Sequence, residues 1–261
     1  MPRESRETIF EEEKDCGLFI ETLAEVCGRT GWKVCAFVLM PNHYHMVVET
    51  PEANLVAGMK WFQGTYTKRH NYRHQERGHL YQGRYKSVII DPGDSAYFRT
   101  ACDYVHLNPV RARLAGADDS VSLGEYRWSS SWYLSRPLSE IPSWLSLGCI
   151  VEESTSKANS LQSRRLYLES LEQCDEVEEA AYRPLRRGWC LGSAEFKEEL
   201  RGGLCEALER IERDSMVGEV RRLHDETEAE RMLIHAAGHV ELDLAGVDLL
   251  KKGEFRKGLI A

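Results

Sequence analysis

The sequence contains no long hydrophobic run. No stretch approaches the roughly 18 consecutive apolar residues that a transmembrane helix requires. The opening residues MPRESRETIFEEEKD also lack the apolar core of a signal peptide. These absences argue against a membrane protein, and we expect a cytoplasmic one.

The sequence also lacks paired cysteines. None of its 8 cysteines forms a CxxC pair, which disfavours a zinc knuckle, a redox motif and a compact disulfide framework. We interpret them as reduced, mostly buried small hydrophobic residues. Internal repeats and low-complexity tracts are absent as well. With 42% hydrophobic and 29% charged residues, the composition is that of an ordinary globular protein.

A net positive charge is the third absence. The chain has 34 Lys and Arg against 42 Asp and Glu, a formal charge of −8, which taken alone argues against a nucleic-acid partner. The average hides a basic segment from Lys60 to Arg113. It holds ten basic and four acidic residues, so it is +6 and the rest must carry −14 to reach −8. Interleaved aromatic residues suit this segment to phosphate contacts and base stacking, although a charge run is more often a solvated face.

The apolar periodicity predicts an alternating set of helices and strands. Its order is a helix over 17–28, strands over 33–39 and 43–49 separated by Met-Pro-Asn, a helix over 55–72, a strand over 85–91 and a helix over 96–107. Asn108-Pro109 should end or bend the last helix. This order predicts an α+β fold of the ferredoxin-like or RRM-like kind, an antiparallel sheet with helices on one face. One strand is missing at the front.

The character of the chain changes near residue 148. We expect one unit over 1–148, with an irregular aromatic and proline-rich arm over 126–142. A mainly helical acidic region over 149–261 follows it.

Two histidines flank a tyrosine at the start of the second predicted strand. Alternate residues of a strand share a face, so His43 and His45 lie on one face and Tyr44 on the other. Two imidazoles on one face make half of a metal site. The alternative is a pair of surface histidines on a sheet.

The helix predicted over 96–107 ends near two further polar side chains. Tyr104 and Asn108 are four residues apart and therefore share a helix face. An Asn carbonyl oxygen suits Mg²⁺ or Mn²⁺, and a phenol beside such an ion could ionise enough to attack a phosphate. Alternatively, Tyr104 packs in the core and Asn108 only terminates the helix before Pro109.

Several ordered motifs together resemble a known family. They are LMPNHYHMVVETP, GHLYQGRYKS, YVHLNPVRARL and EYRWSSSWYL. The chain resembles the REP-associated tyrosine transposases, relatives of the single-tyrosine insertion-sequence transposases of the HUH superfamily. The resemblance extends over about residues 7–134 and continues more weakly beyond.

This resemblance implies a metal-dependent enzyme of DNA transposition that nicks and rejoins single-stranded DNA at or near hairpins. It implies that His43, His45 and Asn108 bind Mg²⁺ or Mn²⁺, and that Tyr104 attacks the scissile phosphate to form a 5′-phosphotyrosine intermediate. Tyr97 is the second choice of nucleophile. The implied partner is single-stranded or hairpin DNA, and the protein would be a monomer or a homodimer. We expect the DNA to be held by the basic aromatic segment, through Lys60, Lys68, Arg69, Arg73, Arg77, Tyr81, Arg84, Lys86 and Arg111.

The resemblance also implies two missing pieces. Family members begin with a further strand and continue into another helical segment, so by this comparison the chain lacks the first strand and the extreme C-terminal segment. Either the start is misassigned, or the chain is a decayed copy, or another element fills the gap in the sheet.

Two other functions stay open at this level. One is a catalytically inactive or truncated family member that binds DNA or RNA hairpins. The other is a metal-dependent hydrolase of small phosphoesters, which leaves the basic aromatic segment unexplained.

Overall fold

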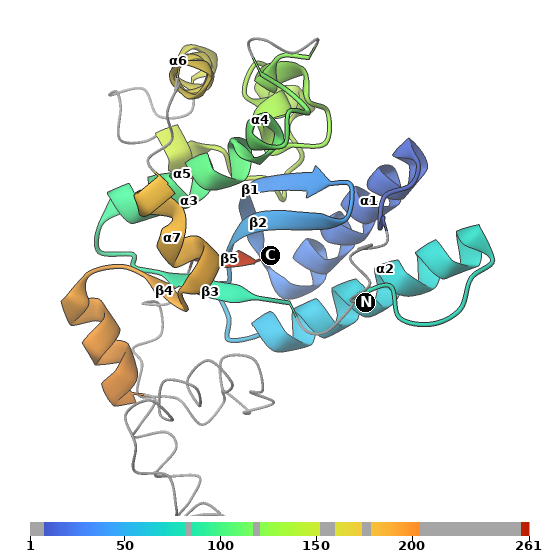
Figure 1. Ribbon diagram of the computed structural model, residues 1–261, viewed down its shortest axis with the longest axis horizontal. Coiled ribbons are helices and arrows are strands. Elements are labelled where there is room, and N and C mark those ends of the chain that lie inside the picture. Colours follow the sequence, from blue (N-terminus) through green and yellow to red (C-terminus); the bar gives the residue numbers. More distant parts are fainter. Residues whose placement is uncertain are drawn as a thin grey trace, which may run out of the picture.

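The computed structural model describes residues 8–81, 85–116, 121–151, 160–173, 179–203 and 257–260. Its fold is α+β, as predicted, and is built on one five-stranded sheet (Figure 1). In spatial order the strands are β1 (Lys33–Met40), β2 (His43–Glu49), β5 (Lys257–Ile260), β3 (Ser87–Ile90) and β4 (Cys190–Leu191).

Strands β1 and β2 form the predicted antiparallel hairpin. Pro41 and Asn42 make the connection, and the register places Met40 opposite His43 and Val38 opposite His45. Seven of the eight residues of β1 are buried. A strand that is buried along its whole length must be covered on both faces of the sheet.

Helices cover both faces of this hairpin. Helices α1 (Glu13–Thr30) and α2 (Leu55–His74) lie on the Tyr44 face, where the Tyr44 ring is 4.8 Å from that of Phe19. Helix α3 (Ser95–His106) lies on the His45 face, with Tyr104 against His45. The prediction of helices on one face was therefore wrong, because the apolar runs of β1 and β2 require cover on the second face as well.

The first three helices match their predicted positions. Helices α1 and α2 extend beyond the predicted bounds, whereas α3 begins and ends one residue earlier than predicted. Helix α1 begins after Glu12, which forms a capping box with Asp15, and ends at Gly31, whose φ of 73° is left-handed. Asp94 caps α3 by accepting a hydrogen bond from the Ala96 amide. Helix α3 ends just before Asn108-Pro109, as predicted, and the short α4 (Asn108–Arg111) follows.

The arm after α4 is irregular, as predicted, and consists largely of 3-10 turns: η1 (Leu123–Glu125), η2 (Ser130–Tyr133) and η3 (Leu138–Glu140). It is followed by α5 (Gly148–Val151), α6 (Leu161–Glu172), α7 (Glu179–Arg187) and a helical segment over 194–203. Side chains of α6 and α7, among them Tyr167 and Tyr182, belong to the same hydrophobic core as the sheet. The division near residue 148 stays a prediction.

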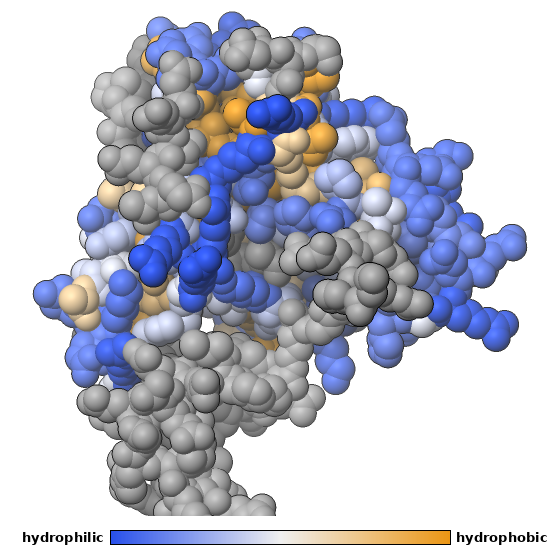
Figure 2. All heavy atoms as spheres, viewed as in Figure 1, coloured by the Kyte–Doolittle hydropathy of each residue, from blue (hydrophilic) through white to orange (hydrophobic). Residues whose placement is uncertain are grey.

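The surface seen in the same view is mostly hydrophilic, and hydrophobic side chains gather mainly in its upper part, near α4 (Figure 2). Among the described residues, no helix is both long and apolar enough to cross a membrane.

Two strands were missed by the sequence analysis. Strand β4 has two residues and β5 has four, too few to give a periodic signal. Strand β5 matters most, because it pairs with both β2 and β3. The gap expected beside the histidine strand is thus filled by another element of the chain.

Candidate active site

His43 and His45 lie side by side at the start of β2, as the spacing predicted. Their ring centroids are 5.0 Å apart, with planes at 81°. The Nδ1 atom of His43 lies 2.7 Å from the side-chain oxygen of Asn42. Since that oxygen can only accept, Nδ1 is the donor of this bond, and a neutral ring in this tautomer carries its lone pair on Nε2.

His45 is 8% exposed, and its Nδ1 atom has no hydrogen-bond partner among the described residues. Burial, followed by the charges of His43, Arg111 and Lys86, lowers the pKa of His45 to about 3. The ring is therefore neutral and keeps a buried lone pair. An orphaned buried nitrogen of this kind fits a metal ligand.

Tyr104 packs against this pair from α3. Its ring centroid is 5.4 Å from that of His45, and the residue is 6% exposed. Asn108 donates a hydrogen bond from Nδ2 to the Tyr104 carbonyl oxygen at 2.7 Å. This bond turns the amide nitrogen toward the helix and fixes the orientation of Oδ1, the atom suited to a hard cation.

Two further side chains enclose Tyr104. The Arg111 guanidinium carbon lies 5.2 Å from the centroid of the Tyr104 ring and 4.5 Å from that of Tyr182. Tyr182, from α7, is 6% exposed, and its ring centroid is 5.4 Å from that of Tyr104. Sequence reasoning predicted Arg111 as a DNA contact but missed Tyr182, since no local motif marks a residue that reaches the site from a distant helix.

A buried hydrogen-bond chain anchors α3 beneath the site. The Tyr167 hydroxyl donates to Asp103 at 2.7 Å and lies 2.9 Å from His106 Nδ1. His106 Nε2 lies 2.7 Å from Ser130 Oγ, which accepts the Phe37 amide proton. Burial lowers the pKa of His106 to about 3, so the ring is neutral, donates from Nδ1 and accepts at Nε2. The chain ties α3 to α6, η2 and β1, and thereby fixes where Tyr104 lies.

The predicted DNA contacts separate into exposed and internally bonded side chains. Lys60, Lys68, Arg77 and Lys86 are exposed, and Lys86 donates a hydrogen bond to the Arg186 carbonyl oxygen. Arg84 lies outside the described residues. Exposed cations can contact a phosphate backbone, so these four keep their predicted role as candidates.

Three other predicted contacts face the protein itself, two through ion pairs and one through ring packing. Arg69 and Arg73 are ion-paired with acidic residues of α1 and of the turn before it. The ring centroid of Tyr81 lies 6.1 Å from that of Tyr44, and its hydroxyl is buried with no hydrogen-bond partner among the described residues. Tyr81 therefore packs on the α1 and α2 side of the sheet, away from His45.

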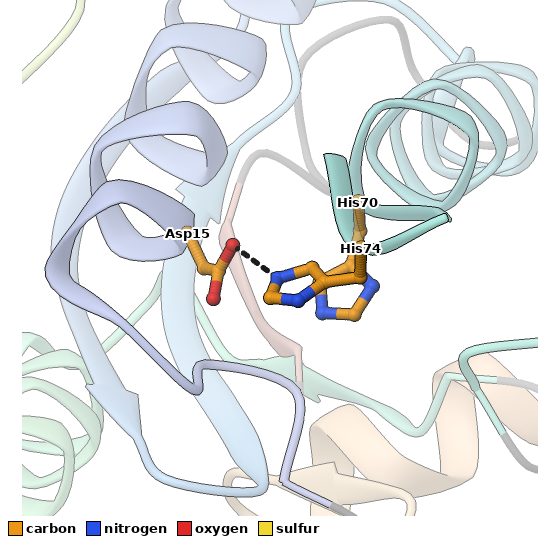
Figure 3. A group of neighbouring side chains, drawn as sticks. All are labelled: Asp15, His70 and His74. Atoms are coloured by element: carbon orange, nitrogen blue, oxygen red, sulfur yellow. Dashed lines mark hydrogen bonds and ion pairs between the residues drawn. The ribbon is translucent and has the colours of Figure 1, made fainter. Parts of the chain in front are cut away.

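A second histidine cluster lies on that side. Asp15, His70 and His74 place ligand atoms within 4.8 Å of one another and could hold a metal ion (Figure 3). The rings of His70 and His74 are stacked, with centroids 4.3 Å apart and planes at 28°. Both ring nitrogens of His70 are buried with no hydrogen-bond partner among the described residues. Burial, followed by the charge of His74, lowers the pKa of His70.

Asp15 is already fully bonded. Its Oδ2 accepts the amide protons of Glu11 and Glu12, and its Oδ1 lies 2.9 Å from both Arg73 Nε and His74 Nε2. Burial opposes ionisation, but the bonds from Arg73 and His74 outweigh it and lower the pKa of Asp15 to about 2. A cation here would compete with the Arg73 guanidinium, so the bonding favours a structural ion pair.

Comparison with known proteins gives one match. Residues 1–108 match the family described as "Transposase IS200 like". This match supports the transposase family for the part of the chain that holds β1, β2, β3 and α3. No curated protein and no solved structure matches the chain.

Proposed function

We propose that this protein is a metal-dependent, REP-associated transposase of the HUH type, which nicks and rejoins single-stranded DNA at hairpins. The observation that carries the proposal is the packing of Tyr104 against His45, which itself lies against His43. This arrangement falls within the residues that match the IS200-like family.

The donor set fits a hard divalent cation such as Mg²⁺ or Mn²⁺. His43 and His45 would supply ring nitrogens and Asn108 its amide oxygen, and the orphaned Nδ1 of His45 supports this assignment. A bound cation would neutralise charge that develops on the scissile phosphate.

Tyr104 would carry out the covalent step. Its hydroxyl oxygen loses its proton and attacks phosphorus, so that a bond forms from tyrosine to the 5′ phosphate. The bond to the 3′ oxygen breaks, and that oxygen takes up a proton to leave a 3′-hydroxyl. The reverse attack by a 3′-hydroxyl rejoins DNA and frees Tyr104. Arg111, over the Tyr104 ring, would offer its charge to the phosphate oxygens.

The DNA would lie across the exposed cations Lys60, Lys68, Arg77 and Lys86. Tyr72, in the same segment, is 90% exposed and suits stacking on an unpaired base.

We further propose that the protein is cytoplasmic and is a monomer or a homodimer. The order β1-β2-β5-β3 supports a ferredoxin-like core, with β5 in the place of its first strand.

The test is covalent capture. Incubated with hairpin-bearing single-stranded DNA and Mn²⁺, the protein should give an adduct that resists denaturation and disappears with chelator or in Tyr104→Phe. Tyr97→Phe, on the same helix, is the matched control and should keep the adduct. An adduct that persists in Tyr104→Phe and is lost in Tyr97→Phe would assign the nucleophile to Tyr97.

One observation favours a second function. Tyr104 is covered by Tyr182 and Arg111 and only 6% exposed, as expected of a catalytically inactive protein that binds DNA or RNA hairpins. This alternative predicts salt-dependent hairpin binding without metal-dependent nicking, and an affinity that His43→Ala leaves unchanged.

A further inference from the structure

Strand β5 lies between two strands that are distant from it in sequence. It pairs antiparallel with β2, Met46 opposite Ile260 through Glu49 opposite Lys257. It also pairs antiparallel with β3, Ser87 opposite Ile260. Figure 1 shows β5 as the short red arrow between β2 and β3.

The connection between β2 and β3 explains why there is room for a strand. Both strands are antiparallel to β5, so they run parallel to each other, and α2 joins them as a crossover. The crossover leaves a slot one strand wide.

The slot lies in the buried part of the sheet. Met46, Val47, Val48 and Val88 border it, and each is 2% exposed or less. With β5 in place these residues are shielded from water, and their backbone amide and carbonyl groups need hydrogen-bond partners within the protein. An empty slot would remove the ladder partners of two strand edges in the middle of the sheet, so an extended segment is recognised there through its backbone.

The same slot borders the candidate active site. Ile260 is opposite both Met46 and Ser87, the residues that directly follow His45 and Lys86. The strand therefore holds the His45 end of β2 at a fixed spacing from the Lys86 end of β3. It also joins β1 and β2 to β3 and β4 in one sheet.

We propose that the slot between β2 and β3 is a strand-docking site, that residues 257–260 of the same chain are its occupant, and that their docking is required to assemble the active site. The effect on catalysis rests on the proposed function. The docking itself does not, and it is measured separately.

The first measurement is amide hydrogen exchange. In a chain lacking residues 257–261, amides of 46–49 and 87–89 should exchange at least tenfold faster than in the full chain. A synthetic peptide of residues 253–261 should restore their protection, whereas the same peptide with proline in place of Leu259 should not. Unchanged protection after removal of 257–261 would overturn the proposal.

The full-length chain gives a second test that does not depend on the truncated chain folding. In a central strand each residue's N–H bonds to one neighbour or the other, so Leu259→Pro removes a ladder bond whichever side it faces. Leu259→Pro should lose protection at 46–49 and 87–89, while Leu259→Ala keeps it. Equal protection in both variants would overturn the proposal. Protection that rises with protein concentration would assign the strand to a second copy and overturn docking within one chain.

The activity measurement compares the full chain with the chain that lacks residues 257–261, with and without the peptide. Adduct formation should fall at least tenfold on removal of 257–261 and return with the peptide. If wild-type protein forms no adduct while the exchange results hold, the proposed function fails and the docking site stands. If adduct formation is unaffected by the removal, the link between docking and the active site is wrong.

Discussion

The molecule holds two histidine pairs, one on each face of the sheet, and their surroundings differ. His43 and His45 are two apart on a strand, with rings at 81°. His70 and His74 are four apart on a helix, with stacked rings, and His74 bonds to an aspartate that also binds an arginine. The strand pair lies beside a tyrosine and a second arginine, an arrangement that suits a ligand with a phosphate. The comparison teaches that the partners of histidines, and not their number, separate a candidate catalytic pair from a structural one.

The largest expected effect tests this contrast directly. The double variant His43→Ala/His45→Ala should reduce Mn²⁺-dependent adduct formation on the order of 100-fold or more, because both ring ligands are removed. The matched variant His70→Ala/His74→Ala should remain nearly as active as wild type at a temperature where both are folded. Single-turnover adduct assays, with folding checked by circular dichroism, measure both. An equal loss in a folded His70→Ala/His74→Ala protein would move the metal site to the helix pair.

A smaller effect is expected on stability. Asp15→Asn should lower the free energy of unfolding by about 2 kcal/mol at neutral pH, because the carboxylate is stabilised by Arg73 and His74. The folded pKa of about 2 lies below the ordinary value of 3.8, so this stabilisation is complete above about pH 4 and is lost as the pH falls toward 2. Urea unfolding of both proteins at several pH values measures the difference. A difference that persists unchanged at pH 2 would contradict the role of the charge.

Arg111, beside the His43 and His45 pair, should contribute to adduct formation through the planar shape of its guanidinium as well as through its charge. Arg111→Lys should slow adduct formation roughly tenfold, because lysine cannot place a planar guanidinium over the rings of Tyr104 and Tyr182. Arg113→Lys, at an exposed position nearby, is the control and should have no effect. Equal rates in Arg111→Lys and wild type would remove Arg111 from the site.

The smallest effect concerns DNA affinity at two exposed cations, Lys68 on α2 and Arg77 just after its end. Lys68→Ala/Arg77→Ala should weaken hairpin binding and reduce the slope of log affinity against log salt by about 2, roughly 0.9 for each phosphate that is no longer neutralised. Arg165→Ala, an exposed arginine on α6, should leave the slope unchanged. Fluorescence anisotropy at several salt concentrations measures the slopes. An unchanged slope in Lys68→Ala/Arg77→Ala would place the DNA elsewhere.

Local sequence led to reliable expectations where one element decides the outcome. The alternation of His43, Tyr44 and His45 fixed their faces, and Asp94 and Asn108-Pro109 set the ends of α3. Prediction from local sequence failed where side chains from several helices and strands meet. Arg73 looked like a DNA contact from charge alone, yet it is paired with Asp15, 58 residues earlier. Tyr182 carries no local signal, because its place beside Tyr104 depends on how α7 packs.

By itself, the sequence determined the α+β order of elements, the shared face of the two site histidines and the basic character of the central segment, since each follows from residue spacing or type along one stretch. Only the tertiary structure decided that helices cover both faces of the hairpin, which histidine pair lies beside Tyr104 and which beside Asp15, and that residues 257–260 complete the sheet between β2 and β3. These outcomes depend on backbone and side-chain groups that meet across long sequence separations, and a local pattern contains no information on which distant group will satisfy a buried hydrogen bond.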